Sequence, residues 1–263
     1  MNFVKTPDKI SISPYDNIAF YDAEIMTVYF ETNPEILERL IPAPLKPAPM
    51  PLGAAFIAQY PKTNIGITYQ ESALFLLVEY NGEQGLYPVS VPVTNDMALI
   101  LGRELFGYPK KIAQVGFERE GDDVRGWSER HGIRFFEATA KLTGKFNDTR
   151  AQQLMTERMK SNPDVSVFNF KYFPAPEGEG FDYNPRLVRG VVKRNPKSIE
   201  MGEAELKFTP SDHDPWSDVE IVRVIGAVYT VTNNTLLPGS VVDEVEPSEF
   251  LPYSFMKLDS FSA

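Results

Sequence analysis

Short apolar stretches separated by glycine, proline and charged residues run along most of the chain and predict a protein built mainly from strands. The β-branched and aromatic residues of 25–32 favour a strand, and 52–60 has a similar pattern. Segment 72–80, SALFLLVEY, is apolar at most positions, so we expect both of its faces to be covered. Further strands are expected in 110–120, 124–130, 133–146, 165–173, 185–195, 203–209 and 219–237.

Capping residues predict two helices in the first half of the chain. Asn33 can cap a helix that starts at Pro34 and carries an apolar stripe over 36–41. A second helix is expected over 95–106, with Gly107 where a left-handed residue ends a helix and Pro109 just beyond. A short helix is expected over 148–160, and the proline-rich segments 42–52 and 174–185 are expected to be a connector and a surface loop.

These elements predict a β-rich α+β fold, an antiparallel barrel or cone-like sheet with a few short helices. The absence of an internal repeat or a long linker predicts a single domain over 1–263.

Composition narrows the possible functions. No apolar run reaches the length of about 18 residues that a membrane helix needs, and the N-terminus lacks a secretory layout, so we expect a soluble, cytoplasmic protein with no membrane partner. The 26 basic and 36 acidic residues give a net charge of -10, which weighs against a nucleic-acid partner. Without cysteine, and with the histidines far apart in the sequence at His131 and His213, we expect no metal site and no other cofactor. The segment HDPWSD at 213–218 is expected to be a structural turn.

The adjacent lysines Lys110 and Lys111 follow directly after the second predicted helix. Neighbouring lysines are commonly solvated surface charge, but this pair lies in a defined place, after a helix end and a Gly-Tyr-Pro turn. An ordinary lysine, with a pKa of about 10.4, is neutral in only about one molecule in 2,500 at pH 7. A lysine amine that burial or a nearby cation makes neutral can form an iminium ion with a ketone.

The segment GRELFGYPKK, preceded by VTNDMALIL and followed by IAQVGF, resembles the Schiff-base segment of the acetoacetate decarboxylase family. The segments IPAPL and ITYQES also resemble family motifs, so the likeness extends with gaps over most of the chain. The resemblance implies that Lys110 is the Schiff-base nucleophile, Lys111 its electrostatic neighbour and Glu71 an acid/base group. It also implies a cofactor-independent lyase that acts on a small keto acid, and a homo-oligomer.

Two aspects of this segment stay open at the level of sequence. Successive side chains of a strand point to opposite faces, so Lys111 is expected to lie away from Lys110 and to pair with an acid elsewhere. We therefore expect desolvation to influence Lys110 more than Lys111 does. Arg103 and Glu104 either join the helix to the lysine strand or take part in the site.

The chain departs from the family pattern at two positions. Ala23 stands where the family's decarboxylases carry an arginine suited to a substrate carboxylate, and Phe56 stands where they carry a second carboxylate. These losses weigh against acetoacetate itself and leave decarboxylase, aldolase and aldolase-dehydratase chemistry open, the last two with an aldehyde co-substrate. A tyrosine could supply some of the missing polarity, and the candidates are Tyr21, Tyr69, Tyr108 and Tyr253. The rival interpretation is a non-catalytic barrel that binds an apolar molecule.

Overall fold

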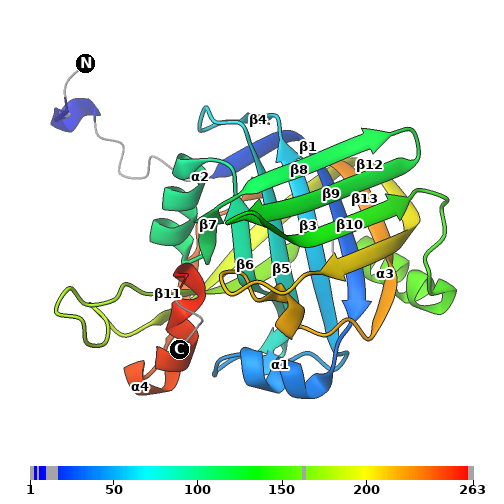
Figure 1. Ribbon diagram of the computed structural model, residues 1–263. Coiled ribbons are helices and arrows are strands. Elements are labelled where there is room, and N and C mark those ends of the chain that lie inside the picture. The colour runs from blue at the N-terminus through cyan, green and yellow to red at the C-terminus, as the bar shows by residue number, and fades with distance from the viewer. Residues whose placement is uncertain (1–2, 5, 10–16, 162–163, 260–263) are drawn as a thin grey trace.

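The computed structural model describes residues 3–4, 6–9, 17–161 and 164–259 (Figure 1). Its strands are β1 (Ile18–Glu31), β2 (Lys46–Pro47), β3 (Leu52–Tyr60), β4 (Lys62–Thr63), β5 (Tyr69–Tyr80), β6 (Glu83–Val93), β7 (Lys110–Ile112), β8 (Gln114–Glu120), β9 (Asp123–Arg130), β10 (Ile133–Lys141), β11 (Val165–Lys171), β12 (Arg186–Phe208), β13 (Arg223–Leu236) and β14 (Ser240–Glu244). Its helices and helical turns are η1 (Pro7–Lys9), α1 (Pro34–Leu40), α2 (Asp96–Leu101), η2 (Gly102–Phe106), α3 (Thr149–Ser161), η3 (Trp216–Asp218), α4 (Pro247–Phe250) and η4 (Leu251–Lys257).

The main sheet closes on itself as a ring. Its strands follow the order β11-β6-β5-β3-β1-β13-β12, and pairing of β11 with β12 completes the circuit. Most neighbours are antiparallel, but β6 pairs in parallel with both β7 and β11. The predicted fold class, a β-rich sheet with a few short helices, is confirmed.

An outer layer of strands covers part of the ring. Strand β12 is 23 residues long, and beyond the ring its second half pairs with β10, which continues to β9 and β8. These strands pass in front of β1 and β3 in Figure 1. The largest core cluster lies between the two layers and joins ring residues such as Met26 and Ile57 to Phe117 and Phe135 of the outer layer.

Strand alternation gives the ring strands beneath the outer layer two buried faces. On β1, Met26 and Val28 belong to the core under the outer layer, whereas Ile25 and Thr27 line a cavity inside the ring. Strand β5 is covered in the same way, which explains why 72–80 is apolar on both faces.

Helix ends form as the capping residues predict. The Asn33 side chain accepts a hydrogen bond from the Glu35 amide, and the Asn95 side chain accepts one from the Ala98 amide. The second predicted helix consists of α2 followed by one π-helical turn, η2. Gly107 ends this turn with φ at 87°, and a Cβ there would stand 2.6 Å from the Phe170 carbonyl oxygen.

Three features differ from the sequence-based expectations. Strand β6 was not expected, because Pro88 and Pro92 interrupt its apolar pattern. The connector over 42–52 makes a short pairing with β5 through Lys46 and Pro47. Strand β12 joins the two separately predicted strands 185–195 and 203–209. In the described part of the chain, none of the helices combines the length and apolar character needed to cross a bilayer.

Candidate active site

The ring encloses a cavity of about 220 Å³. Most of its wall is apolar and comes from all seven ring strands, with Phe20, Ile25, Phe56, Phe75, Leu86, Val165, Val167, Val192, Val228 and Leu236 among the lining residues. The ionisable side chains of the wall are Glu71, Lys110, Arg194, Tyr29, Tyr60, Tyr69 and Tyr108.

Lys110 and Glu71 form an ion pair in the cavity wall. The Lys110 Nζ lies 2.6 Å from Glu71 Oε2, and the two side chains are only 8% and 12% exposed. Parallel pairing of β7 with β6 sets Lys110 opposite Val91, while Glu71 on β5 faces Val93 of the same strand. A buried amine in contact with a carboxylate can pass a proton to it directly. A lysine needs such a proton acceptor before its amine can act as a nucleophile.

Tyrosines surround this pair. The Lys110 Nζ lies 5.5 Å from the ring centre of Tyr69 and 5.7 Å from that of Tyr108. Burial raises the pKa of Tyr60 and Tyr69 well above the ordinary value, and the charge of Glu71 adds to the rise. Burial also raises the pKa of Tyr108. The three phenols therefore stay protonated near neutral pH and offer hydroxyl donors to a bound molecule.

The π-helical turn makes room for the lysine stem. Gly102 opens η2, and a Cβ built on it would lie 2.6 Å from both Cδ and Cε of Lys110. The side chain of Lys110 thus passes directly over the backbone of Gly102, and any larger residue there would displace it.

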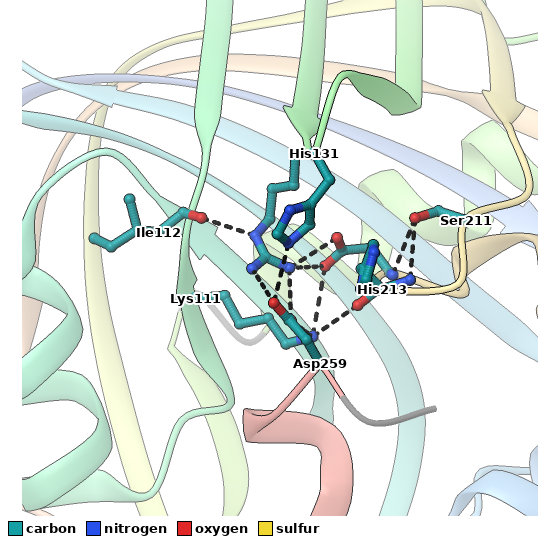
Figure 2. A network of polar contacts seen from close by, with 8 residues as sticks. Lys111, Ile112, His131, Ser211, His213 and Asp259 are labelled. Carbon is teal, nitrogen blue, oxygen red and sulfur yellow. Dashed lines mark hydrogen bonds and ion pairs between the residues drawn. The ribbon is translucent and has the colours of Figure 1, made fainter. Parts of the chain in front are cut away.

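Lys111 lies outside the cavity, as the alternation along β7 requires. Its Nζ donates a hydrogen bond of 2.8 Å to the His213 carbonyl oxygen and lies 3.0 Å from Asp259 Oδ1 and 3.7 Å from Asp214 Oδ1. Burial lowers the pKa of Lys111, and the two carboxylates oppose that shift. The structure therefore does not place Lys111 beside Lys110. Figure 2 shows Lys111 with His213 and Asp259.

Some of the other candidate residues line the cavity, and the rest lie outside its wall. Phe56, Tyr69 and Tyr108 line the cavity, and Ala23 is fully buried in the cluster of side chains that includes Tyr60 and Tyr69.

Tyr253 and Arg103 are not part of the cavity wall, and neither are Tyr21, Ala23 and Glu104. Tyr253 lines a separate cavity of about 440 Å³ together with Lys111, because η4 packs on the outside of the ring. Arg103 is on η2, and its charge acts on Tyr172 and Lys257 near the C-terminal segment.

Tyr60, Arg194 and Tyr29 are among the cavity residues that were missed from sequence. Tyr60 lies on the same face of β3 as Phe56, so the period of two could have identified it. Arg194 lines the cavity from β12, opposite Asn234 of β13. No local motif marks Arg194, and only closure of the ring brings it to the cavity that Lys110 faces.

A closed ring of strands around an apolar cavity with a few convergent polar groups is typical of proteins that bind small molecules. The sequence profile of the acetoacetate decarboxylase (ADC) family matches residues 1–245, and the chain belongs to this family. It is 28% identical over 238 residues to an acetoacetate decarboxylase from Burkholderia vietnamiensis, covering 90% of this chain and 92% of the relative. It is 24% identical over 241 residues to a CLA biosynthesis isomerase from Lactiplantibacillus plantarum, covering 88% of this chain and 85% of the relative.

Solved structures show the same fold. The acetoacetate decarboxylase from Legionella pneumophila superposes with a TM-score of 0.77 at 22% identity, over 92% of this chain and 93% of that one. The enduracididine biosynthesis enzyme MppR, complexed with the condensation product of pyruvate and imidazole 4-carboxaldehyde, superposes with a TM-score of 0.72 at 18% identity. That match covers 88% of this chain and 90% of MppR.

Proposed function

We propose that the chain is a cofactor-independent lyase that binds a small keto acid as a Schiff base on Lys110 and uses Glu71 to move protons. The observation that carries the proposal is the buried contact of 2.6 Å between Lys110 Nζ and Glu71 Oε2 in the wall of the cavity inside the ring. The family's enzymes and the complexes of MppR with pyruvate and with its condensation product support it.

In the first half of the reaction, Glu71 accepts a proton from the Lys110 ammonium group. The neutral amine attacks the ketone carbon, and the carbinolamine loses water when the Glu71 acid protonates the departing hydroxyl group. This step gives an iminium ion and returns Glu71 to its carboxylate form.

The second half divides into two branches. For a β-keto acid, loss of carbon dioxide leaves its electron pair in the enamine. Glu71 takes up a proton from solvent and delivers it to the enamine carbon, which restores the iminium ion and the Glu71 carboxylate. For pyruvate, the Glu71 carboxylate removes a methyl proton to give the enamine. The enamine attacks an aldehyde carbon, and the Glu71 acid protonates the new alkoxide. Hydrolysis of the iminium releases the product in both branches.

Arg194 is the proposed partner of the substrate carboxylate. Among the described residues, Arg194 and Lys110 are the basic side chains of the cavity wall. Arg194 and Tyr108 both line the cavity, so a keto acid bound there can contact both side chains. Arg194 already has an interaction in the folded chain, but a guanidinium group has five N–H donors and can hold a second partner.

We favour the aldol branch because Phe56 lines the cavity where the family's decarboxylases carry a second carboxylate, and Ala23, buried in the adjacent cluster, stands in place of their arginine. The MppR complex with a condensation product of pyruvate and an aldehyde supports this choice by analogy.

The test is intact-mass spectrometry after borohydride reduction with pyruvate and, separately, with acetoacetate. We expect a reduced adduct on the wild-type chain and none on Lys110→Ala, whereas the control Lys46→Ala, an exposed lysine, keeps the adduct. The mass of the acetoacetate adduct shows whether carbon dioxide was lost before reduction. Absence of any adduct on the wild type would reject the proposal and favour the apolar-ligand binding protein.

A new carbon–carbon bond between pyruvate and an aldehyde, detected by NMR of the products, is expected for the aldol branch. An enzyme that forms the pyruvate imine but converts no member of a panel of aromatic and unsaturated aldehydes would contradict that branch.

A further inference from the structure

The two histidines of the chain lie side by side although they are far apart in sequence. His131 occupies the turn between β9 and β10, and His213 lies in the loop after β12. Their ring centres are 4.1 Å apart. Figure 2 shows both imidazoles beside Asp259, which follows η4 near the C-terminus.

Asp259 completes a group of three metal-ligand side chains. Its Oδ2 lies 3.1 Å from Nε2 of His131. One ligand atom each from His131, His213 and Asp259 all lie within 4.8 Å of one another. In a tetrahedral site with metal–ligand bonds of about 2.0–2.1 Å, ligand atoms stand about 3.4 Å apart, so side-chain shifts of about 1.5 Å or less would close the group on an ion.

His213 lacks a polar partner for one ring nitrogen. Its Nδ1 is buried and makes no hydrogen bond in the described part of the chain. A buried imidazole nitrogen without a partner is unfavourable, and coordination of the ring to a metal is one way in which proteins use such a histidine.

The turn that holds His131 does not require an imidazole. His131 has φ of 51° and the following Gly132 has φ of 75°. These are the left-handed conformations of a two-residue hairpin turn, in which asparagine followed by glycine is strongly preferred. The ring of His131 is nevertheless directed at Asp259, and its side chain is 46% exposed, so an ion can reach it from solvent.

The surrounding charges balance, and they hold Asp259 in place. Arg130 donates to both oxygens of Asp259 at 3.0 and 2.9 Å and also binds Asp214, while Lys111 contacts both carboxylates. Two cations therefore face two anions, and an incoming divalent ion meets no net positive charge. Hydrogen bonds of this kind to a ligating carboxylate are the usual outer contacts of a metal site.

We propose that His131, His213 and Asp259 bind one divalent transition-metal ion, with zinc as the representative of the class. The mixture of imidazole and carboxylate ligands suits zinc, cobalt, nickel and copper better than magnesium or calcium. Binding replaces the hydrogen bond between His131 and Asp259, and the imidazole proton of His131 then resides on Nδ1. Water completes the coordination on the exposed side.

The site would be structural. It lies with Lys111 on the outside of the ring, away from the cavity that contains Lys110. The ion ties three segments together, namely the β9–β10 turn, the loop after β12 and the chain after η4.

The test uses metal-stripped full-length protein. Calorimetric titration with zinc chloride is expected to show one equivalent bound, with affinity at least tenfold weaker in His131→Asn and in His213→Asn. His131→Asn keeps the preferred residue for the turn and removes only the imidazole. Asp212→Ala, which removes an exposed carboxylate next to His213, is the matched control and should bind zinc as the wild type does.

Copper electron paramagnetic resonance assigns the ligands. Because the chain contains two histidines and no cysteine, coupling to two imidazole nitrogens can come only from His131 and His213. At a hundredfold excess over Kd, zinc should raise the melting temperature of the wild type by about 5 °C or more. It should leave that of the double variant, which combines His131→Asn with His213→Asn, unchanged.

Circular dichroism without metal establishes that each variant folds. Asp259→Asn removes the third ligand's charge and keeps the shape of the side chain. No zinc binding to the wild type, or equal binding to the folded double variant through surface carboxylates, would overturn the proposal.

Discussion

The amino groups of Lys110 and Lys111 lie on opposite sides of β7, although the two residues are adjacent in the chain. Lys110 Nζ contacts Glu71 in the cavity wall, and Lys111 Nζ contacts Asp259 and the His213 carbonyl group on the outside of the ring. The ammonium group of Lys111 therefore belongs to a separate polar network. Substitution of each lysine is expected to have a different effect on stability and on adduct formation.

Lys111→Met is expected to destabilise the fold and to leave adduct formation on Lys110 intact. Removal of the ammonium group leaves the fully buried Asp214 with Arg130 alone, and breaking a buried pair in this way costs about 3 kcal/mol. Urea unfolding measures the loss, and borohydride trapping measures the adduct. Lys197→Met, which removes an exposed ion pair with Asp22, should cost much less. A stable Lys111→Met protein that cannot form the adduct would show that Lys111 serves the chemistry.

Glu71→Gln is expected to separate imine formation from proton transfer. The amide keeps the shape of the side chain but can no longer accept a proton, so exchange of the pyruvate methyl protons with deuterium should fall by about 10²–10⁴-fold. NMR in deuterated water follows this exchange, and mass spectrometry follows the adduct. Exchange at the wild-type rate would exclude Glu71 as the base.

Gly102→Ala is expected to displace the Lys110 side chain. The added methyl group would meet Cδ and Cε at 2.6 Å, and the flexible lysine stem, rather than the backbone, would move. The yield of reduced adduct should therefore fall at least tenfold while the melting temperature changes little. Gly190→Ala on β12, whose Cβ would have its nearest neighbour at 3.7 Å, is the control and should keep the adduct. Equal adduct yields in the two variants would contradict the close packing of Lys110 over η2.

Arg194→Gln is expected to weaken binding of keto acids without weakening binding of uncharged ketones. Loss of a charged hydrogen bond to a carboxylate costs about 1.5–3 kcal/mol, which corresponds to a rise in KM of about 10- to 100-fold for pyruvate. Adduct formation with a methyl ketone should be unchanged. A similar loss for both compounds would assign Arg194 to the fold instead of the substrate.

Lys257 is expected to make the free energy of unfolding depend on pH. Burial lowers the pKa of Lys257 to about 7, and the charges of Arg103 and Lys171 add to the effect. The unfolded chain, with an ordinary lysine pKa of about 10.4, binds more protons between these values, so stability should rise with pH from about 7 to 10, by up to about 1.4 kcal/mol per pH unit.

The variant Lys257→Met removes this contribution, and it should be more stable than the wild type at pH 6.5 and approach it at pH 10. Parallel pH profiles of urea unfolding for the two proteins would contradict the assignment.

Local sequence signals predict much of the fold. The caps at Asn33 and Asn95 and the glycine at 107 depend on neighbouring residues, so sequence alone identifies α1 and the helical segment before Lys110. Strand β6 escapes detection because Pro88 and Pro92 break its apolar pattern.

The same distinction between local signals and distant contacts applies to the candidate site. Glu71 and Lys110 belong to motifs that resemble a family, and the structure brings them together. Arg194 and the meeting of His131 with His213 depend on pairings between distant strands and loops, which no window of sequence contains. The opposite orientations of Lys110 and Lys111 follow from strand alternation and could be predicted.

The π-helical turn restricts how this segment can change during evolution. An insertion or deletion between Gly102 and Pro109 would rotate the helix by about 100° per residue and carry Gly102 away from the lysine stem. Members of the family should therefore keep the length of this segment constant.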